Sequence, residues 1–70
     1  MIEIGTKLKE LRLELGLSQT AFATSIGVTQ DSISLWEQNK RIPDTVYIVE
    51  ICKKYKISAD YLLGLDENKF

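Results

Sequence analysis

Apolar residues recur three or four positions apart along most of the chain, which is the spacing of α-helices with one buried side. The first stripe is Ile4, Leu8, Leu11 and Leu15, and it predicts a helix from Ile4 or Thr6 to about Leu15. Each later stripe follows a Ser, Thr or Asp whose side chain can accept a backbone N–H of the first helical turn. These caps predict four more helices, beginning after Ser18, Thr29, Asp44 (to about Tyr55) and Ser58. The pattern predicts an all-α protein, a single compact bundle of five helices.

The stretch from Ser18 to Asn39 holds two of these helices, joined by a tight turn at Gly27. Glycine tolerates the left-handed conformation that a helix end often requires, so Gly27 is placed to end the first of the two. Asn39 follows the second helix at the corresponding position, and Asn tolerates this conformation better than most residues. Two short capped helices joined by a short turn are typical of a helix-turn-helix.

The helix over residues 30–38 has two chemically different sides. At about 100° per residue, the inner side carries apolar residues and one carboxylate: Thr29, Ile33, Trp36 and Glu37. The outer side carries short hydrogen-bonding groups and one leucine, namely Asp31, Ser34, Leu35 and Gln38, with Gln30 projecting from the first turn. Such a side suits base edges, because Gln can pair bidentately with adenine and an aliphatic group can rest on a thymine methyl. A polar side that faces only solvent would look the same, so the pattern alone leaves both interpretations open.

The second half of the chain supplies the rest of the expected core. In the helix that ends near Tyr55, the buried side is predicted to be Ile48, Ile51, Cys52 and Tyr55, with Cys52 as a small core residue. Five apolar residues exceed what the helix stripes need: Val46, Tyr47, Val49, Tyr61 and Leu65. They either pack in the core or form a patch for a second copy of the chain.

Length and composition indicate one small globular domain over residues 1–70, with a core from about 4 to 65 and a frayed tail at 66–70. No apolar run approaches the roughly 20 residues of a membrane span. The N-terminus lacks the apolar core of a signal peptide. The single cysteine cannot form an internal disulfide, which favours a cytoplasmic location.

The titratable residues argue against several classes of function. The chain has no histidine, one cysteine and no glycine-rich phosphate loop, so neither an enzyme nor a metal or other cofactor is expected. No small-molecule site is evident. Nine basic and ten acidic residues give a net charge of −1, which argues against a strong nonspecific grip on nucleic acid. The position of the charges matters more than their sum.

A series of short segments covers the chain from about Ile4 to Leu65: LKELR at 8–12, GLSQ at 16–19, Phe22-Ala23, Ile26-Gly27-Val28, Thr29, Ile33-Ser34, Trp36-Glu37, Pro43 and SADYLLG at 58–64. In identity, order and spacing these segments resemble the lambda-repressor-like, Cro/repressor-type (XRE) helix-turn-helix family. The resemblance implies a five-helix fold that binds operator DNA, usually as a two-fold dimer.

The resemblance also implies roles for individual residues. Gln19 would hold a backbone phosphate and brace the helix over 30–38, and Arg12 would pair with Glu37 inside the protein. Ala23 would be the small residue that lets the two motif helices approach closely. With the outer-side residue Gln38, the candidate DNA-binding residues are Gln19, Thr29, Gln30, Asp31, Ser32, Ser34, Leu35, Gln38, Lys40 and Arg41. Within this set, Thr29, Ser32, Lys40 and Arg41 are expected near phosphates, and Gln30, Asp31, Ser34 and Leu35 at base edges.

Three positions depart from the family's pattern. Asn39 and Lys56 stand where glycine is usual, and Asp31 places a carboxylate on the side expected to face phosphates. Asp31 either accepts from a cytosine amino group or caps backbone donors of the first helical turn, and capping is preferred.

The sequence therefore predicts a sequence-specific transcriptional regulator, expected to be a repressor, that reads operator half-sites in the major groove as a homodimer on double-stranded DNA. The alternative is a protein-interaction module, or an antitoxin-type partner with weak or no DNA binding of its own. The slightly negative net charge and the five excess apolar residues motivate that alternative.

Overall fold

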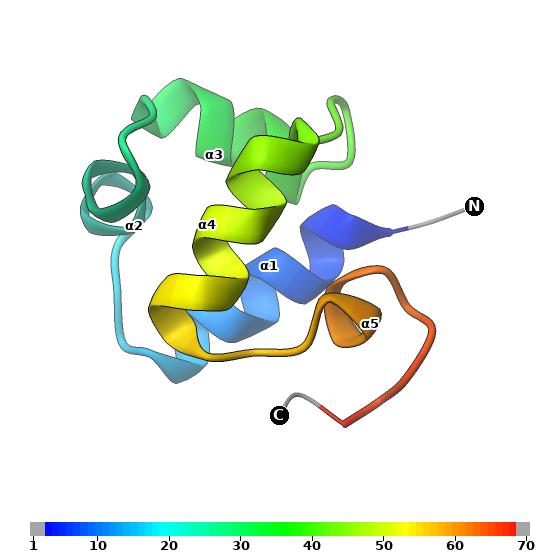
Figure 1. Ribbon diagram of the computed structural model, residues 1–70. Coiled ribbons are helices and arrows are strands. Elements are labelled where there is room, and N and C mark those ends of the chain that lie inside the picture. The colour runs from blue at the N-terminus through cyan, green and yellow to red at the C-terminus, as the bar shows by residue number, and fades with distance from the viewer. Residues whose placement is uncertain (1–2, 69–70) are drawn as a thin grey trace.

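The computed structural model describes residues 3–68, and over that range the chain forms five helices and no strand, as predicted (Figure 1). The helices are α1 (Ile4–Glu14), α2 (Gln19–Ile26), α3 (Gln30–Glu37), α4 (Thr45–Tyr55) and α5 (Ala59–Leu62). None of them is long and apolar enough to cross a membrane. Residues 69 and 70 of the expected tail lie outside the described range, and the single-domain assignment stays a prediction.

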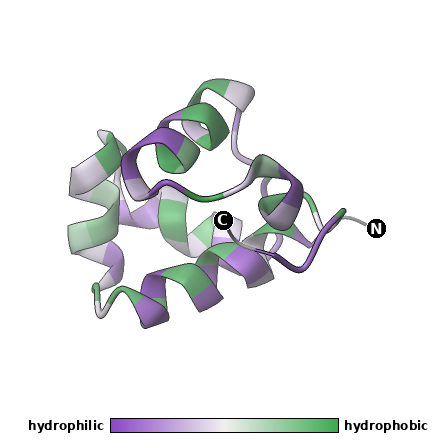
Figure 2. Ribbon diagram, turned by 60° about the horizontal axis from the view of Figure 1, so that its bottom comes forward, coloured by the Kyte–Doolittle hydropathy of each residue, from purple (hydrophilic) through white to green (hydrophobic). Residues whose placement is uncertain are grey.

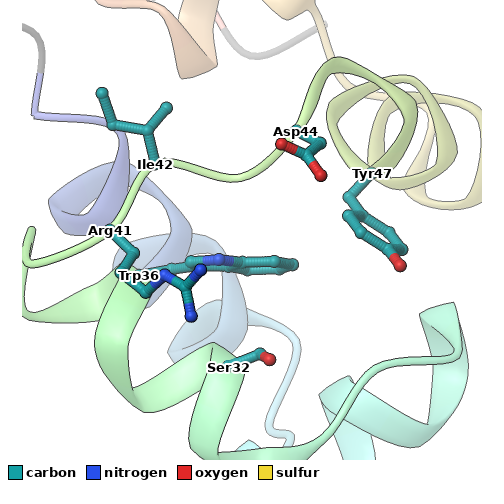
Figure 3. Close-up of a pocket in the computed structure, with 6 residues that line it drawn as sticks. All are labelled: Ser32, Trp36, Arg41, Ile42, Asp44 and Tyr47. Atoms are coloured by element: carbon teal, nitrogen blue, oxygen red, sulfur yellow. The ribbon is translucent and has the colours of Figure 1, made fainter.

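Three of the four predicted caps are confirmed. Ser18 Oγ accepts from the N–H of Ala21 at 3.0 Å, Thr29 Oγ1 from Ser32 at 3.2 Å, and Ser58 Oγ from Tyr61 at 3.4 Å. The fourth is wrong in part. Asp44 occupies the N-cap position of α4, but its side chain makes no cap hydrogen bond. Its carboxylate lies beside a surface pocket instead (Figure 3).

Left-handed residues end the helices where the sequence indicated. Gly27 has φ +77° at the end of α2, and Asn39 has φ +59° just after α3. Lys56 ends α4 at φ +54°, a conformation that costs a residue with a Cβ about 1 to 2 kcal/mol.

The core lies where the five helices meet. In Figure 2, apolar and polar residues alternate along the helices, so that each helix has an apolar side. The buried apolar residues are Ile4, Leu8, Leu11, Phe22, Ala23, Ile33, Trp36, Ile51, Ile57, Tyr61 and Leu62. Ile48, Cys52 and Tyr55 pack against this core but are only partly buried. Burial raises the pKa of the Cys52 thiol, which disfavours the reactive thiolate.

Two residues expected on buried sides lie at the surface. Leu15 is 41% exposed, because α1 ends at Glu14 and the chain turns away at Gly16. Thr29 is exposed because, as the N-cap, it precedes the first turn of α3.

The five excess apolar residues divide between core and surface. Tyr61 is buried, and the ring of Tyr47 packs against that of Trp36, with centroids 5.6 Å apart. Val46, Val49 and Leu65 remain 59%, 42% and 75% exposed, so these three of the five are the most accessible to a second copy.

Tyr61 ties α5 to α1 through its hydroxyl, which donates to Glu10 Oε2 at 3.1 Å, while Lys7 Nζ lies 5.0 Å from the ring centroid. Burial, helped by the hydrogen bond and charge of Glu10, raises the pKa of Tyr61 to about 12. The pKa of a tyrosine in an unfolded chain is about 10, so the folded state holds this proton more tightly. The resulting stability is present below about pH 10 and is lost as the pH rises toward about 12.

We therefore expect the free energy of unfolding of the wild type to fall by about 2 kcal/mol more than that of Tyr61→Phe between about pH 9 and about pH 12. The two proteins differ only in the hydroxyl of residue 61, so the difference between their profiles isolates that group. Urea denaturation across this pH range measures it. Parallel profiles for the two proteins would contradict the assigned role of the hydroxyl.

Candidate nucleic-acid interface

The inner side of α3 is anchored in the core. Ile33 and Trp36 are 1% and 6% exposed, and α3 packs against both α2 and α1. Ala23 of α2 is buried, as expected for the small residue between the two motif helices. The anchoring leaves α3 only one orientation, with its polar side outward.

The outer side of α3 is accessible. Gln30, Asp31 and Gln38 are exposed, and Ser34 and Leu35 are half-buried. Gln38 Nε2 donates to Ser34 Oγ at 2.8 Å, which joins two of the outer residues. The predicted base-reading residues thus share one surface, and no neighbouring segment covers them fully.

The residues expected near phosphates flank that surface at both ends of α3. At its start, Thr29 Oγ1 and Ser32 Oγ lie 3.1 Å apart. After its end, Lys40 and Arg41 are exposed, and their backbone N–H groups both donate to the carbonyl of Leu35, at 3.0 and 3.3 Å. The loop therefore folds back onto α3, which holds the two cations close to the helix.

A small open pocket of about 140 Å³ lies between α3, this loop and the start of α4 (Figure 3). Its lining residues are Ser32, Trp36, Arg41, Ile42, Asp44 and Tyr47. In Figure 3 the Trp36 ring lies at the centre, with the Arg41 guanidinium beside it and Asp44 and Tyr47 across from it. The pocket is therefore of mixed charge. Nothing in the sequence pattern indicated it, because it depends on how the loop brings α3 and α4 together.

Arg12 and Glu37 form the predicted internal pair, which joins α1 to α3. Arg12 Nε donates to Glu37 Oε2 at 2.6 Å and Arg12 Nη2 to Oε1 at 3.0 Å, with the side chains 10% and 3% exposed. Arg12 Nη1 also donates to the carbonyl of Leu17 at 2.9 Å. The hydrogen bonds that Arg12 donates to Glu37, together with the charge of that carboxylate, raise the pKa of Arg12 against the opposing effect of burial. The guanidinium therefore stays charged wherever the protein is folded.

The pair continues to the outer side of α3 through two glutamines. Gln19 Nε2 donates to Glu37 Oε1 at 3.1 Å, and Gln30 Nε2 donates to Gln19 Oε1 at 2.6 Å. We call Arg12, Glu37, Gln19 and Gln30 the polar chain. Gln19 thus braces α3, as the resemblance implied, but its direct bond to Gln30 was not anticipated.

Asp31 does not act as a cap. Within residues 3–68 its carboxylate accepts no hydrogen bond from a first-turn amide, because the Thr29 hydroxyl takes the N–H of Ser32. The expectation of capping is therefore wrong. The carboxylate stands exposed at the positive end of the helix, where its charge is favourable.

A family model described as Helix-turn-helix matches residues 8–62, which is most of the chain. The chain belongs to the helix-turn-helix family. This confirms the resemblance to the XRE type, since the relatives include an HTH-type transcriptional regulator and a phage repressor.

Two relatives and one solved structure illustrate the family. The HTH-type transcriptional regulator ImmR of Bacillus subtilis (strain 168) is 35% identical over 66 residues, 94% of this chain and 52% of that protein. The antitoxin PezA of Streptococcus pneumoniae serotype 4 is 33% identical over 64 residues, 91% of this chain and 40% of that protein. This chain thus spans about half of ImmR and less of PezA.

The fold is similar to that of the c2 repressor protein of Salmonella phage P22, solved by crystallography in complex with a synthetic operator. The TM-score is 0.82 at 30% sequence identity, covering 90% of this chain and 96% of that chain. A helix-turn-helix chain with this fold is therefore known on operator DNA.

Proposed function

We propose that the protein is a sequence-specific, double-stranded DNA-binding transcriptional regulator, acting as a repressor, with α3 as its recognition helix in the major groove. The observation that carries this proposal is that Ile33 and Trp36 anchor one side of α3 while the polar side stays accessible. The P22 repressor, solved on a synthetic operator, supports it, because the two folds superpose over most of both chains.

The hydrogen bonds of the polar chain determine which atoms of the Gln30 amide remain available to DNA. An ionised Glu37 can only accept hydrogen bonds, so the amino group of Gln19 must face it and the Gln19 oxygen must face Gln30. The Gln30 amide then keeps one N–H and its oxygen for a ligand. Adenine presents an acceptor and a donor side by side in the major groove, which matches this pair. We infer that Gln30 reads an adenine.

The phosphate contacts come from groups around the recognition helix. The hydroxyls of Thr29 and Ser32, the second N–H of Gln19, and the exposed Lys40 and Arg41 are available for them. Two cations beside the helix and a net charge of −1 predict modest affinity for one copy. We therefore propose a homodimer on DNA, with half-sites about 34 Å apart, working in the cytoplasm.

A second candidate function is that of an antitoxin, or another module that binds a protein partner. The similarity to PezA and the exposed side chains of Ile42, Val46 and Leu65 favour it. In this role the apolar residues would meet the partner, and DNA binding would be weak or absent.

Selection of bound duplexes from a random pool, followed by sequencing, tests the two candidates. The proposed function predicts a palindromic consensus with two half-sites about one helical turn apart. A gel shift with the selected duplex then checks the stoichiometry. No enrichment, and no shift at micromolar protein in low salt, would overturn the proposal. A stable complex with a co-encoded protein would then favour the second candidate.

A further inference from the structure

The side chain of Asn39 connects the end of the recognition helix to the start of α1. Asn39 Oδ1 accepts the backbone N–H of Gly5 at 3.0 Å, and Asn39 Nδ2 donates to Thr6 Oγ1 at 3.3 Å. A backbone N–H can only donate, so the amide must have this orientation. These residues lie more than thirty positions apart in the sequence, so the contacts depend on the tertiary fold.

The first contact supplies a cap that α1 lacks locally. Glu3 stands at the N-cap position of α1, but its side chain makes no cap hydrogen bond. Gly5 is the second residue of the helix, whose N–H is one that an N-cap side chain ordinarily takes. Because Gly5 is buried, this N–H would be left without a partner if Asn39 did not accept from it.

The backbones of α1 and α3 meet very closely at this point. A Cβ at Gly5 would lie 1.7 Å from the carbonyl oxygen of Trp36 and 2.7 Å from Asn39 Oδ1. The start of α1 therefore rests directly on the last turn of α3, with its positive end against the negative end of α3. Only glycine fits at position 5.

The backbone of Asn39 also closes the recognition helix. Its N–H donates to the carbonyl of Trp36 at 3.0 Å, and the next N–H, of Lys40, donates to that of Leu35 at 3.0 Å. These two bonds, with φ +59° at Asn39, are the pattern of a Schellman motif. Glycine would adopt this conformation without strain, so the backbone alone does not require an amide at this position. The contacts with α1 are what require an amide side chain at position 39.

We propose that Asn39 is a positioning residue for DNA binding, whose amide fixes the end of the recognition helix and the Lys40–Arg41 loop relative to α1. The inference rests on the proposed function. Lys40 and Arg41 follow Asn39 directly, and their backbone is already held to Leu35. Arg12 and Glu37 already clamp α1 to the same end of α3. The amide of Asn39 supplies a second point of attachment, which prevents α3 from rotating relative to α1 about the first.

The decisive variant is Asn39→Gly, which keeps the left-handed backbone and removes both side-chain bonds. Lys56→Gly is its matched control, since Lys56 is left-handed too and ends α4, outside the DNA-facing surface. Relief of strain, partly offset by the conformational freedom that glycine adds to the unfolded chain, should raise the melting temperature of Lys56→Gly by about 4 to 8 °C. Asn39→Gly should melt below the wild type, and the exchange of its Gly5 amide with solvent should quicken at least about fivefold.

DNA binding separates positioning from stability. With a duplex of random sequence at low salt, and at a temperature where all variants are folded, Asn39→Gly should bind about 3- to 10-fold more weakly than the wild type, with a shallower salt dependence. Lys56→Gly should match the wild type in salt dependence, and any loss of affinity from its missing charge should be smaller than the loss in Asn39→Gly. Asn39→Asp keeps the acceptor for Gly5 and should keep the slow amide exchange.

Unchanged Gly5 exchange in Asn39→Gly would overturn the cap, and unchanged affinity and salt dependence would overturn the positioning role. Failure of the proposed function looks different, because the wild type itself would then bind no duplex. In that case the Gly5 exchange and the backbone mobility of Lys40 and Arg41, both measured without DNA, still decide whether Asn39 fixes this loop.

Discussion

Replacing Arg12 with Met should lower the free energy of unfolding by about 3 kcal/mol or more, because it leaves the carboxylate of Glu37 buried without its cation. The Glu37 side chain is only 3% exposed, and the remaining donor on it is the neutral amide of Gln19. For a domain of this size the melting temperature should fall by about 12 °C or more. Urea denaturation followed by circular dichroism measures the change, and an unchanged denaturant slope shows that the folded state is intact.

Lys9→Met is the matched control, because Lys9 is an exposed cation on the same helix. It should change stability by no more than about 0.5 kcal/mol. The double variant Arg12→Met with Glu37→Met should recover a large part of the loss, since no unpaired charge then stays buried. Recovery stays incomplete because Gln19 loses its acceptor. If Arg12→Met unfolds like Lys9→Met, the buried pair does not hold α1 to α3.

The features that could be predicted from the sequence are mostly local ones. A cap depends on residues three positions apart, so Ser18, Thr29 and Ser58 could be identified without the fold. Helix periodicity likewise predicted that Ile33 and Trp36 would be buried. Asp44 shows the limit of the capping rule, because it identifies a residue type and not the direction of its side chain.

Contacts between distant segments required the structure. The spacing of Arg12 and Glu37 does not itself pair them, and the prediction came from the family resemblance. Asn39 was expected to be left-handed, yet its contacts with Gly5 and Thr6 depend on how α1 crosses the end of α3. The bond from Gln30 to Gln19 is similar, because two exposed polar residues on different helices carry no sequence signal of contact.

The roles of the candidate base-reading and phosphate-contacting residues also depend on more than the local sequence. Helical periodicity places Gln30, Ser34 and Leu35 on one side, and the structure leaves that side accessible. Which of them meets a base depends on how the duplex lies against α3, and helical periodicity does not encode that position. Substitutions separate the two roles, because loss of a base contact weakens binding to particular sequences and loss of a phosphate contact weakens binding to all of them.

Replacing Gln30 with Ala should cost about 1 to 3 kcal/mol of discrimination, roughly 5- to 150-fold, at one base pair of each half-site. The polar chain presents the Gln30 oxygen and one N–H outward as a pair, so their loss should affect an adenine and leave other positions unchanged. Repeating the selection from a random pool with the variant measures this. The consensus should become degenerate at that position alone.

Lys40→Ala is the matched control, because Lys40 carries charge without a fixed direction toward a base. It should weaken binding to selected and unrelated duplexes alike and reduce the salt slope by about 1 per copy. Gln19→Ala should relax the same base pair as Gln30→Ala, since Gln19 holds the Gln30 amide in its orientation. If Gln30→Ala and Lys40→Ala instead weaken binding to all duplexes equally, Gln30 contacts the DNA backbone and does not read the base sequence.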